Sequence, residues 1–67
     1  MANVTVKNAA KIHVCANGPV TFNSIKAYVN SQCCYTFHDY ELAQSLNELI
    51  VEKIISLGED GVSFDPT

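Results

Sequence analysis

The segment from Tyr40 to Leu57 carries more apolar side chains than one face of a helix can hold, and this excess limits the folds open to the chain. At about 100° per residue, most of its apolar side chains fall within an arc of roughly 140°, the face that packs on a sheet. Val51 and Ile55 fall outside this arc, beside Tyr40, and form a second, smaller apolar strip. A helix here therefore needs cover on two sides.

The chain offers little material for that cover, because it has only 67 residues. A chain of this length buries about 60% of its unfolded surface, and small domains usually gain stability from disulfides, a metal or a partner chain. The length predicts one domain over residues 1–67. The second strip is covered either by residues 24–37 or by another chain. The small size favours another chain and predicts a homodimer, the commonest assembly.

Residues 38–57 are predicted to form one long helix. Thr36 and Asp39 are both candidate N-caps, and the acids Asp39 and Glu41 suit the first turn. Gly58 is a natural residue to follow the last turn. Residues 58–67 are predicted to form a turn, a possible short edge strand and a frayed tail.

Residues 1–37 are predicted to form mainly strands, because apolar and polar residues alternate with a period of two. The alternation is clear over residues 3–7, 11–16 and 20–23. Asn17-Gly18 is a strong hairpin signal. A three-residue loop that includes Pro19 keeps one face of the hairpin apolar, whereas a two-residue loop mixes the faces.

Residues 24–37 fit two structures. The alternation favours strand–turn–strand, and a short helix capped by Asn23 or Ser24 is the alternative. With either choice, the sequence predicts an α+β fold. It has a three- to four-stranded antiparallel sheet and one long helix, in the C-terminal half, packed on it.

Charge is divided unevenly along the chain, whose net charge is −3. Residues 1–38 hold three lysines and no acid, whereas residues 39–67 hold seven acids and one lysine. Glu41, Glu48 and Glu52 lie on one stripe of the predicted helix. The stripe is either ordinary solvated surface or an acidic face for a basic partner.

His13, Cys15, Cys34 and His38 could supply four zinc ligands, which suffice for a tetrahedral site. Their spacing matches no strong zinc pattern. We therefore interpret the cysteines as small apolar residues and expect no metal and no cofactor, with a zinc-stabilised module as an alternative.

Catalysis is not expected. The chain has no P-loop, no Gly-rich dinucleotide motif and no metalloprotease motif. Cys34 and His38 could pair as thiolate and base, yet a chain this small leaves little room for a substrate pocket as well.

Single-stranded nucleic-acid binding is the other alternative. Lys7, Lys11 and Lys26 could share an exposed sheet face with Tyr28 and Tyr35, on which bases could stack. However, the chain has no arginine and its pI is about 5.0, whereas nucleic-acid binders are normally basic. Direct nucleic-acid binding is therefore not expected.

The sequence thus predicts a small acidic protein–protein interaction module, an inhibitor or accessory subunit, whose target could be a basic nucleic-acid-handling protein. Viral and phage accessory proteins often have this size and charge balance, a comparison by type only. No apolar run reaches membrane-spanning length and the first residues lack a signal-peptide core, so a cytoplasmic location is expected. The predicted partner-binding residues lie on the long helix: Tyr40, Glu41, Glu48, Val51, Glu52 and Ile55.

Overall fold

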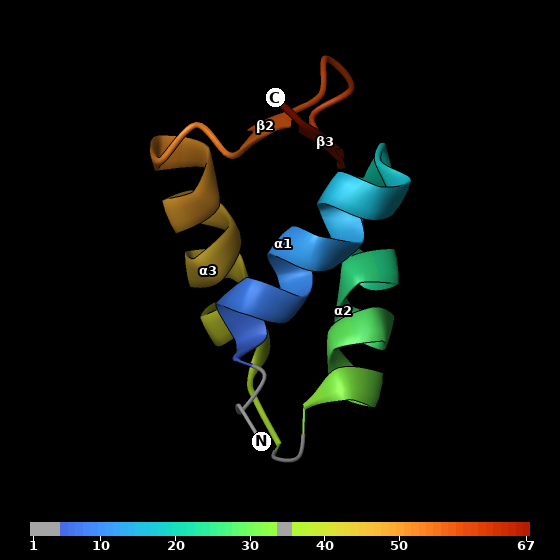
Figure 1. Cartoon of the computed structure of the whole chain (residues 1–67), viewed down its shortest axis with the longest axis vertical. Helices are drawn as coiled ribbons and strands as arrows, with labels where there is room; N and C mark the ends of the chain where they lie inside the picture. The colour runs from blue at the N-terminus through green and yellow to red at the C-terminus, as the bar shows by residue number, and fades with distance from the viewer. Residues whose placement is uncertain (1–4, 34–35) are drawn as a thin grey trace.

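The computed structural model describes residues 5–33 and 36–67, which form three helices and three strands. Along the chain these are α1 (Val6–Asn17), β1 (Val20–Thr21), α2 (Phe22–Gln32), α3 (Asp39–Val51), β2 (Ile55–Leu57) and β3 (Ser63–Pro66). The predicted α+β fold with a three-stranded antiparallel sheet is confirmed. The structure has three helices instead of one: α3 is a shorter form of the predicted helix, and α1 and α2 lie in the part predicted to form strands (Figure 1).

Helix α1 occupies the segment predicted to form the first strands and the hairpin, so that prediction is wrong. Val6, Ala9, Ala10 and Val14 are all buried, and their spacing places them on one face of a helix. The period-two interpretation gave no weight to the two alanines, which complete this face. Thr5 caps the helix, because its Oγ1 accepts a hydrogen bond of 3.1 Å from the N–H of Asn8.

Gly18 ends α1 and does not form the predicted hairpin. Its N–H donates to the carbonyl oxygen of Val14 at 2.8 Å, and its φ of −51° is accessible to any residue. Glycine is required for a different reason, because a Cβ here would lie 2.6 Å from Cδ of Pro66. The end of α1 and strand β3 therefore approach each other through this position.

Helix α2 covers residues 22–32, so the strand–turn–strand interpretation is wrong for these residues. The alternative of a short helix is confirmed. Ile25 and Val29 are fully buried and lie four residues apart, one helical turn. The cap is Thr21, whose Oγ1 accepts from the N–H of Ser24 at 3.3 Å. Two of the predicted residues of this segment, 34 and 35, lie outside the described residues.

Helix α3 begins near the predicted position but ends at Val51, six residues before Leu57. His38 is the N-cap, and its N–H donates to Oε1 of Glu41 at 3.4 Å. Beyond the C-cap, Lys53 adopts a left-handed φ of 64°, which breaks the helix. The β-branched residues that follow form β2 instead, because the strand can pair with β3.

Strand β3 lies between β1 and β2, and both pairings are antiparallel. Phe64 is paired with Val20 on one side and with Leu57 on the other. The edge strand predicted over residues 62–64 is therefore a central strand. The tail predicted to fray is held, because the N–H of Thr67 donates to the carbonyl oxygen of Ile54 at 3.2 Å.

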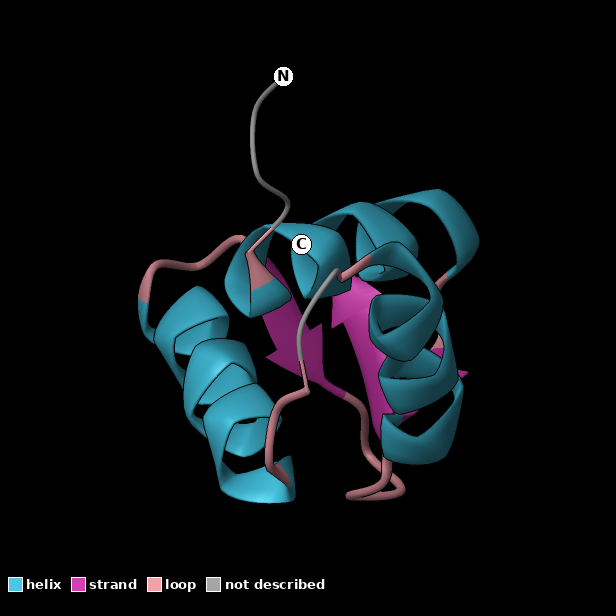
Figure 2. Cartoon of the chain, turned by 90° about the horizontal axis from the view of Figure 1, so that it is seen from below, coloured by secondary structure: helices cyan, strands magenta, loops and turns pink. Residues whose placement is uncertain are grey.

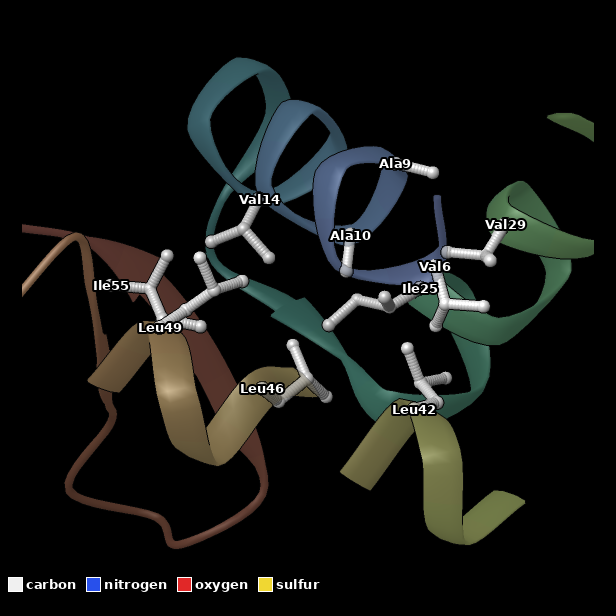
Figure 3. Packing of buried hydrophobic residues seen from close by; sticks show 10 residues of the cluster. All are labelled: Val6, Ala9, Ala10, Val14, Ile25, Val29, Leu42, Leu46, Leu49 and Ile55. Atoms are coloured by element: carbon white, nitrogen blue, oxygen red, sulfur yellow. The ribbon is translucent and has the colours of Figure 1, made fainter. Parts of the chain in front are cut away.

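Helix α1 lies between α2 and α3, and the sheet packs at one end of the three helices (Figures 1 and 2). Leu42, Leu46 and Leu49 of α3 point toward α1, and Ile25 of α2 lies between the helices (Figure 3). The last strand along the chain therefore lies in the middle of the sheet, between two strands that precede it. The core consists of ten buried hydrophobic residues: Val6, Ala9, Ala10, Val14, Ile25, Val29, Leu42, Leu46, Leu49 and Ile55.

Candidate interaction surface

The outer face of α3 carries the two most exposed large hydrophobic residues of the described chain. Tyr40 is 66% exposed and Val51 is 72% exposed, one at each end of the helix. Gln44 and Asn47, also exposed, lie between them. At about 100° per residue the four side chains fall within roughly 60° of arc. We call these four residues the α3 strip: Tyr40, Gln44, Asn47 and Val51.

The α3 strip is what remains of the second apolar strip predicted from the sequence. Tyr40 and Val51 lie where the prediction placed them. Ile55 does not, because α3 ends before it and β2 turns its side chain into the core, where it is 1% exposed. Ile55 cannot contact a partner in this fold, so its assignment to the surface is wrong.

The predicted acidic stripe is largely engaged within the chain. Nζ of Lys7, on α1, lies 2.6 Å from Oε2 of Glu52 and 3.3 Å from Oε1 of Glu48. The hydrogen bond to Glu52 is the main cause that raises the pKa of Lys7. Glu41 accepts from the backbone of the N-cap, as described above. The three acids expected to face a basic target therefore have other partners.

An ion pair also lies on the opposite flank of the α3 strip. Nζ of Lys26, on α2, is 2.7 Å from Oδ1 of Asp39 at the start of α3. On a helical wheel, Asp39 lies about 100° to one side of Tyr40, and Glu48 and Glu52 lie about 80° to 120° to the other. The α3 strip is thus uncharged, and Asp39, Glu48 and Glu52 on its borders each form an ion pair with a lysine of the same chain. Because Glu48 and Glu52 share Lys7, their border keeps a negative charge. Sequence reasoning missed these pairs because they join separate helices.

The three described residues proposed as zinc ligands, His13, Cys15 and His38, do not form a group that could hold a metal ion. His13 stacks on Tyr28 with ring centroids 4.7 Å apart, and its Nε2 lies 3.1 Å from Oγ of Ser24. Cys15 is exposed and points about 160° away from His13 around α1. Cys34 lies outside the described residues. Within residues 5–33 and 36–67, no three His, Cys, Asp or Glu side chains are grouped so that they could hold a metal ion.

The basis for sheet-based binding of single strands is also absent from the described residues. Lys7 and Lys11 are on α1, and Lys26 and Tyr28 are on α2, so none of them lies on the sheet. Tyr35 is not described. Among the described residues, the three lysines and Tyr28 therefore do not form a stacking face on the sheet.

A shallow apolar groove of about 460 Å³ lies between the start of α2 and the β2–β3 connection. Phe22 and Phe64 line it, together with Val62, which is 60% exposed. Sequence reasoning missed this groove, because its walls come from residues about 40 positions apart. Beside it, Oδ1 of Asp60 accepts from the N–H groups of Val62 and Ser63 at 3.0 and 2.9 Å. These bonds hold the pKa of Asp60 below its usual value.

No family model, curated protein or solved structure matches this chain. Along the described chain, no helix combines the length and the apolar character that crossing a membrane requires.

Proposed function

We propose that this chain is a non-catalytic protein-binding domain, an accessory or inhibitory subunit that contacts its partner through the α3 strip. The observation that carries the proposal is the exposure of Tyr40 and Val51 on the same face of one helix. Interfaces are enriched in aromatic residues and depleted of charge at their centres. A helix face with a tyrosine, two amides and a valine has that composition.

Apolar contact supports binding better than attraction to a basic target does. Three of the acids beside the strip already form ion pairs with Lys7 or Lys26, which leaves less negative charge for a basic target. Charge at the rim of an interface mainly alters association rate and partner preference. We therefore assign the affinity to Tyr40 and Val51, and a secondary role to Glu41, Glu48 and Glu52.

Binding of double-stranded nucleic acid is a second candidate, favoured by the two exposed amides of the strip and by the position of α3 as the second of two consecutive helices. In helix-turn-helix domains the second helix of the motif enters the major groove, and Gln and Asn side chains can pair with adenine. Fold alone does not imply function, however. The net charge of −3 opposes the attraction to phosphates on which such binding depends.

A binding selection with matched variants tests the proposal. The chain is immobilised and binders are selected from a displayed library of protein fragments from its source organism. Their affinities are then measured for the wild type and for the double variant Tyr40→Glu/Val51→Glu. We expect the double variant to lose at least about tenfold in affinity, because each glutamate must be desolvated in the interface.

The control is Val62→Glu, a similarly exposed valine on the β2–β3 connection, which should bind as the wild type does. Binders that do not distinguish the double variant from the wild type would contradict the proposal. In parallel, fluorescence anisotropy with random-sequence duplexes at low and moderate salt tests the second candidate. Salt-sensitive duplex binding that Gln44→Ala and Asn47→Ala weaken, without any protein binder, would replace protein binding by nucleic-acid binding.

A further inference from the structure

The groove between the start of α2 and the β2–β3 connection has aromatic and aliphatic side chains in its walls. Phe22 lines it on one side, and Val62 and Phe64 line it on the other. The sheet fixes these walls relative to each other, because Val20, two residues before Phe22, pairs with Phe64. The volume of about 460 Å³ lies in the range of sites that bind ligands. The groove is therefore an apolar site already formed on the surface of the domain.

Two acids of the β2–β3 connection, Glu59 and Asp60, lie next to this groove. Asp60 accepts a hydrogen bond of 3.0 Å from the N–H of Val62, so its carboxylate is in contact with a residue of the groove wall. Glu59 precedes it in the same turn and is exposed. Within the part of the chain that the structure describes, no lysine forms an ion pair with either acid. The groove is thus bordered by two negative charges without a paired cation.

Positive groups on the α2 side of the groove do not cancel these charges. Lys26, one turn after Phe22, is directed toward α3, where its Nζ lies 2.7 Å from Oδ1 of Asp39. The N-terminal end of α2 contributes roughly half a positive charge, against two full negative charges on the connection. None of the six residues that line the groove is basic. The field in the groove is therefore negative and favours a cation.

Aromatic walls beside unpaired carboxylates suit the chemistry of an arginine side chain. A guanidinium group stacks on aromatic rings and is less strongly hydrated than an ammonium group. Its aliphatic stem covers apolar surface while its charged end stays near water. We infer that the groove binds an arginine side chain of a partner protein, with the stem against Phe22, Val62 and Phe64 and the guanidinium group beside Glu59 and Asp60.

The inference goes beyond the proposed function, because the groove and the α3 strip lie on different elements. The strip offers uncharged contact, whereas the groove selects for positive charge. The acids involved also differ, since Glu48 and Glu52 of α3 are already paired with Lys7. Either surface can therefore bind its partner without the other, and the two can be tested separately.

NMR titration of the full, isotope-labelled chain with two peptides that differ in one group tests the inference. The probe is Ac-Leu-Arg-Leu-NH2, and the comparison peptide carries citrulline, which resembles arginine in length and has no charge, at the middle position. We expect the arginine peptide to bind with a Kd of about 1 mM and to shift the amide signals of Asn23, Val62 and Phe64. The citrulline peptide should bind at least about threefold more weakly, because it keeps the stem and loses the charge.

The double variant Glu59→Gln/Asp60→Asn separates charge from shape. An asparagine side chain keeps a carbonyl oxygen for the two backbone N–H groups of the turn, while both charges are removed. The variant should bind the arginine peptide only as well as the citrulline peptide, whose own affinity should not change. Glu59→Gln alone, at a side chain outside the hydrogen bonds of the turn, should give a smaller loss in the same direction.

The matched control is Glu48→Gln/Glu52→Gln, which alters the net charge by the same amount on α3. This control should bind both peptides as the wild type does, because neither residue lines the groove.

Three outcomes would overturn the inference. Equal affinity of the wild type for the two peptides would mean that the groove does not select for charge. A preference for arginine that survives in the double variant, or that the control loses as well, would place the cation elsewhere. Shifts confined to the amides of α3 would mean that the peptide occupies the α3 strip, which would leave the proposed function intact.

Discussion

At the scale of single residues, two lysines from the first half of the sequence form ion pairs with acids of the second half. Counting charges along the chain showed acids in excess after residue 38, and this count is correct. The count could not show that Lys7 and Lys26 lie next to three of those acids, because these ion pairs depend on how the helices pack. Tyr40 and Val51 could be identified in advance, since they needed only the helical period.

Asp60 is the residue whose protonation should affect the fold. Its pKa is lowered, chiefly by the N–H of Val62 and then by the hydroxyl and the N–H of Ser63. Because the folded pKa lies below the unfolded one, the stabilisation is complete above the unfolded pKa and is lost as pH falls through the folded pKa. We therefore expect the β2–β3 connection to loosen only in strong acid.

Carboxyl-detected NMR titration of the side chain measures this directly, and the protection of the Val62 and Ser63 amides against hydrogen exchange, relative to the intrinsic rate at each pH, should fall over the same pH range. Asp60→Asn removes the charge and should flatten the acid limb of the stability profile. An Asp60 titration at the ordinary aspartate pKa would contradict the prediction.

At the scale of elements, short apolar patterns did not distinguish strand from helix. Ile25 and Val29 satisfy both a period of two and one turn of helix, and only packing on α1 decides between them. Ala9 and Ala10 complete the buried face of α1, but alanine carries a weak apolar signal in a pattern search. The start of α3 was nearly correct because capping is local, whereas its end depends on pairing between β2 and β3, which sequence spacing does not reveal.

Substitution by glycine should have opposite effects on stability at Lys53, after the end of α3, and at Lys11, inside α1. Lys53 has a left-handed φ of 64°, a conformation that costs an L-residue roughly 1–2 kcal/mol and glycine almost nothing. Lys53→Gly should therefore raise the free energy of unfolding by about 1 kcal/mol. Lys11→Gly, at an exposed position inside α1, should lower it by about 1 kcal/mol.

Urea denaturation followed by circular dichroism measures both changes. If the two variants moved the unfolding midpoint in the same direction, the left-handed conformation of Lys53 would be contradicted.

At the scale of the whole molecule, the fold depends on a core of ten side chains. Native stability is roughly 0.05–0.15 kcal/mol per residue, which for this length is about 3–10 kcal/mol. Leu49→Ala should cost about 2–5 kcal/mol, because Leu49 is fully buried and the remaining core cannot fill the cavity. We therefore expect this variant to lose a large part of the stability of the domain and to unfold at a much lower temperature than the wild type.

Val51→Ala, two residues further along α3, is the matched control. Its side chain is 72% exposed, so the substitution should change stability by less than about 0.5 kcal/mol. Thermal denaturation of the two variants should thus separate core from surface on one helix. Equal losses would mean that Val51 is covered and that the α3 strip is not a free surface.

The central place of β3 determines when the molecule can fold during its synthesis. The strand that joins β1 to β2 is the last element along the chain, so the sheet cannot close until residues 63–66 have left the ribosome. Until then β1 and β2 have no strand between them, although all ten residues of the core have already been made. A chain stalled or cut shortly before Ser63 should consequently present unpaired strand edges and be a substrate for chaperones and proteases, while its helices have the same sequence as in the folded domain.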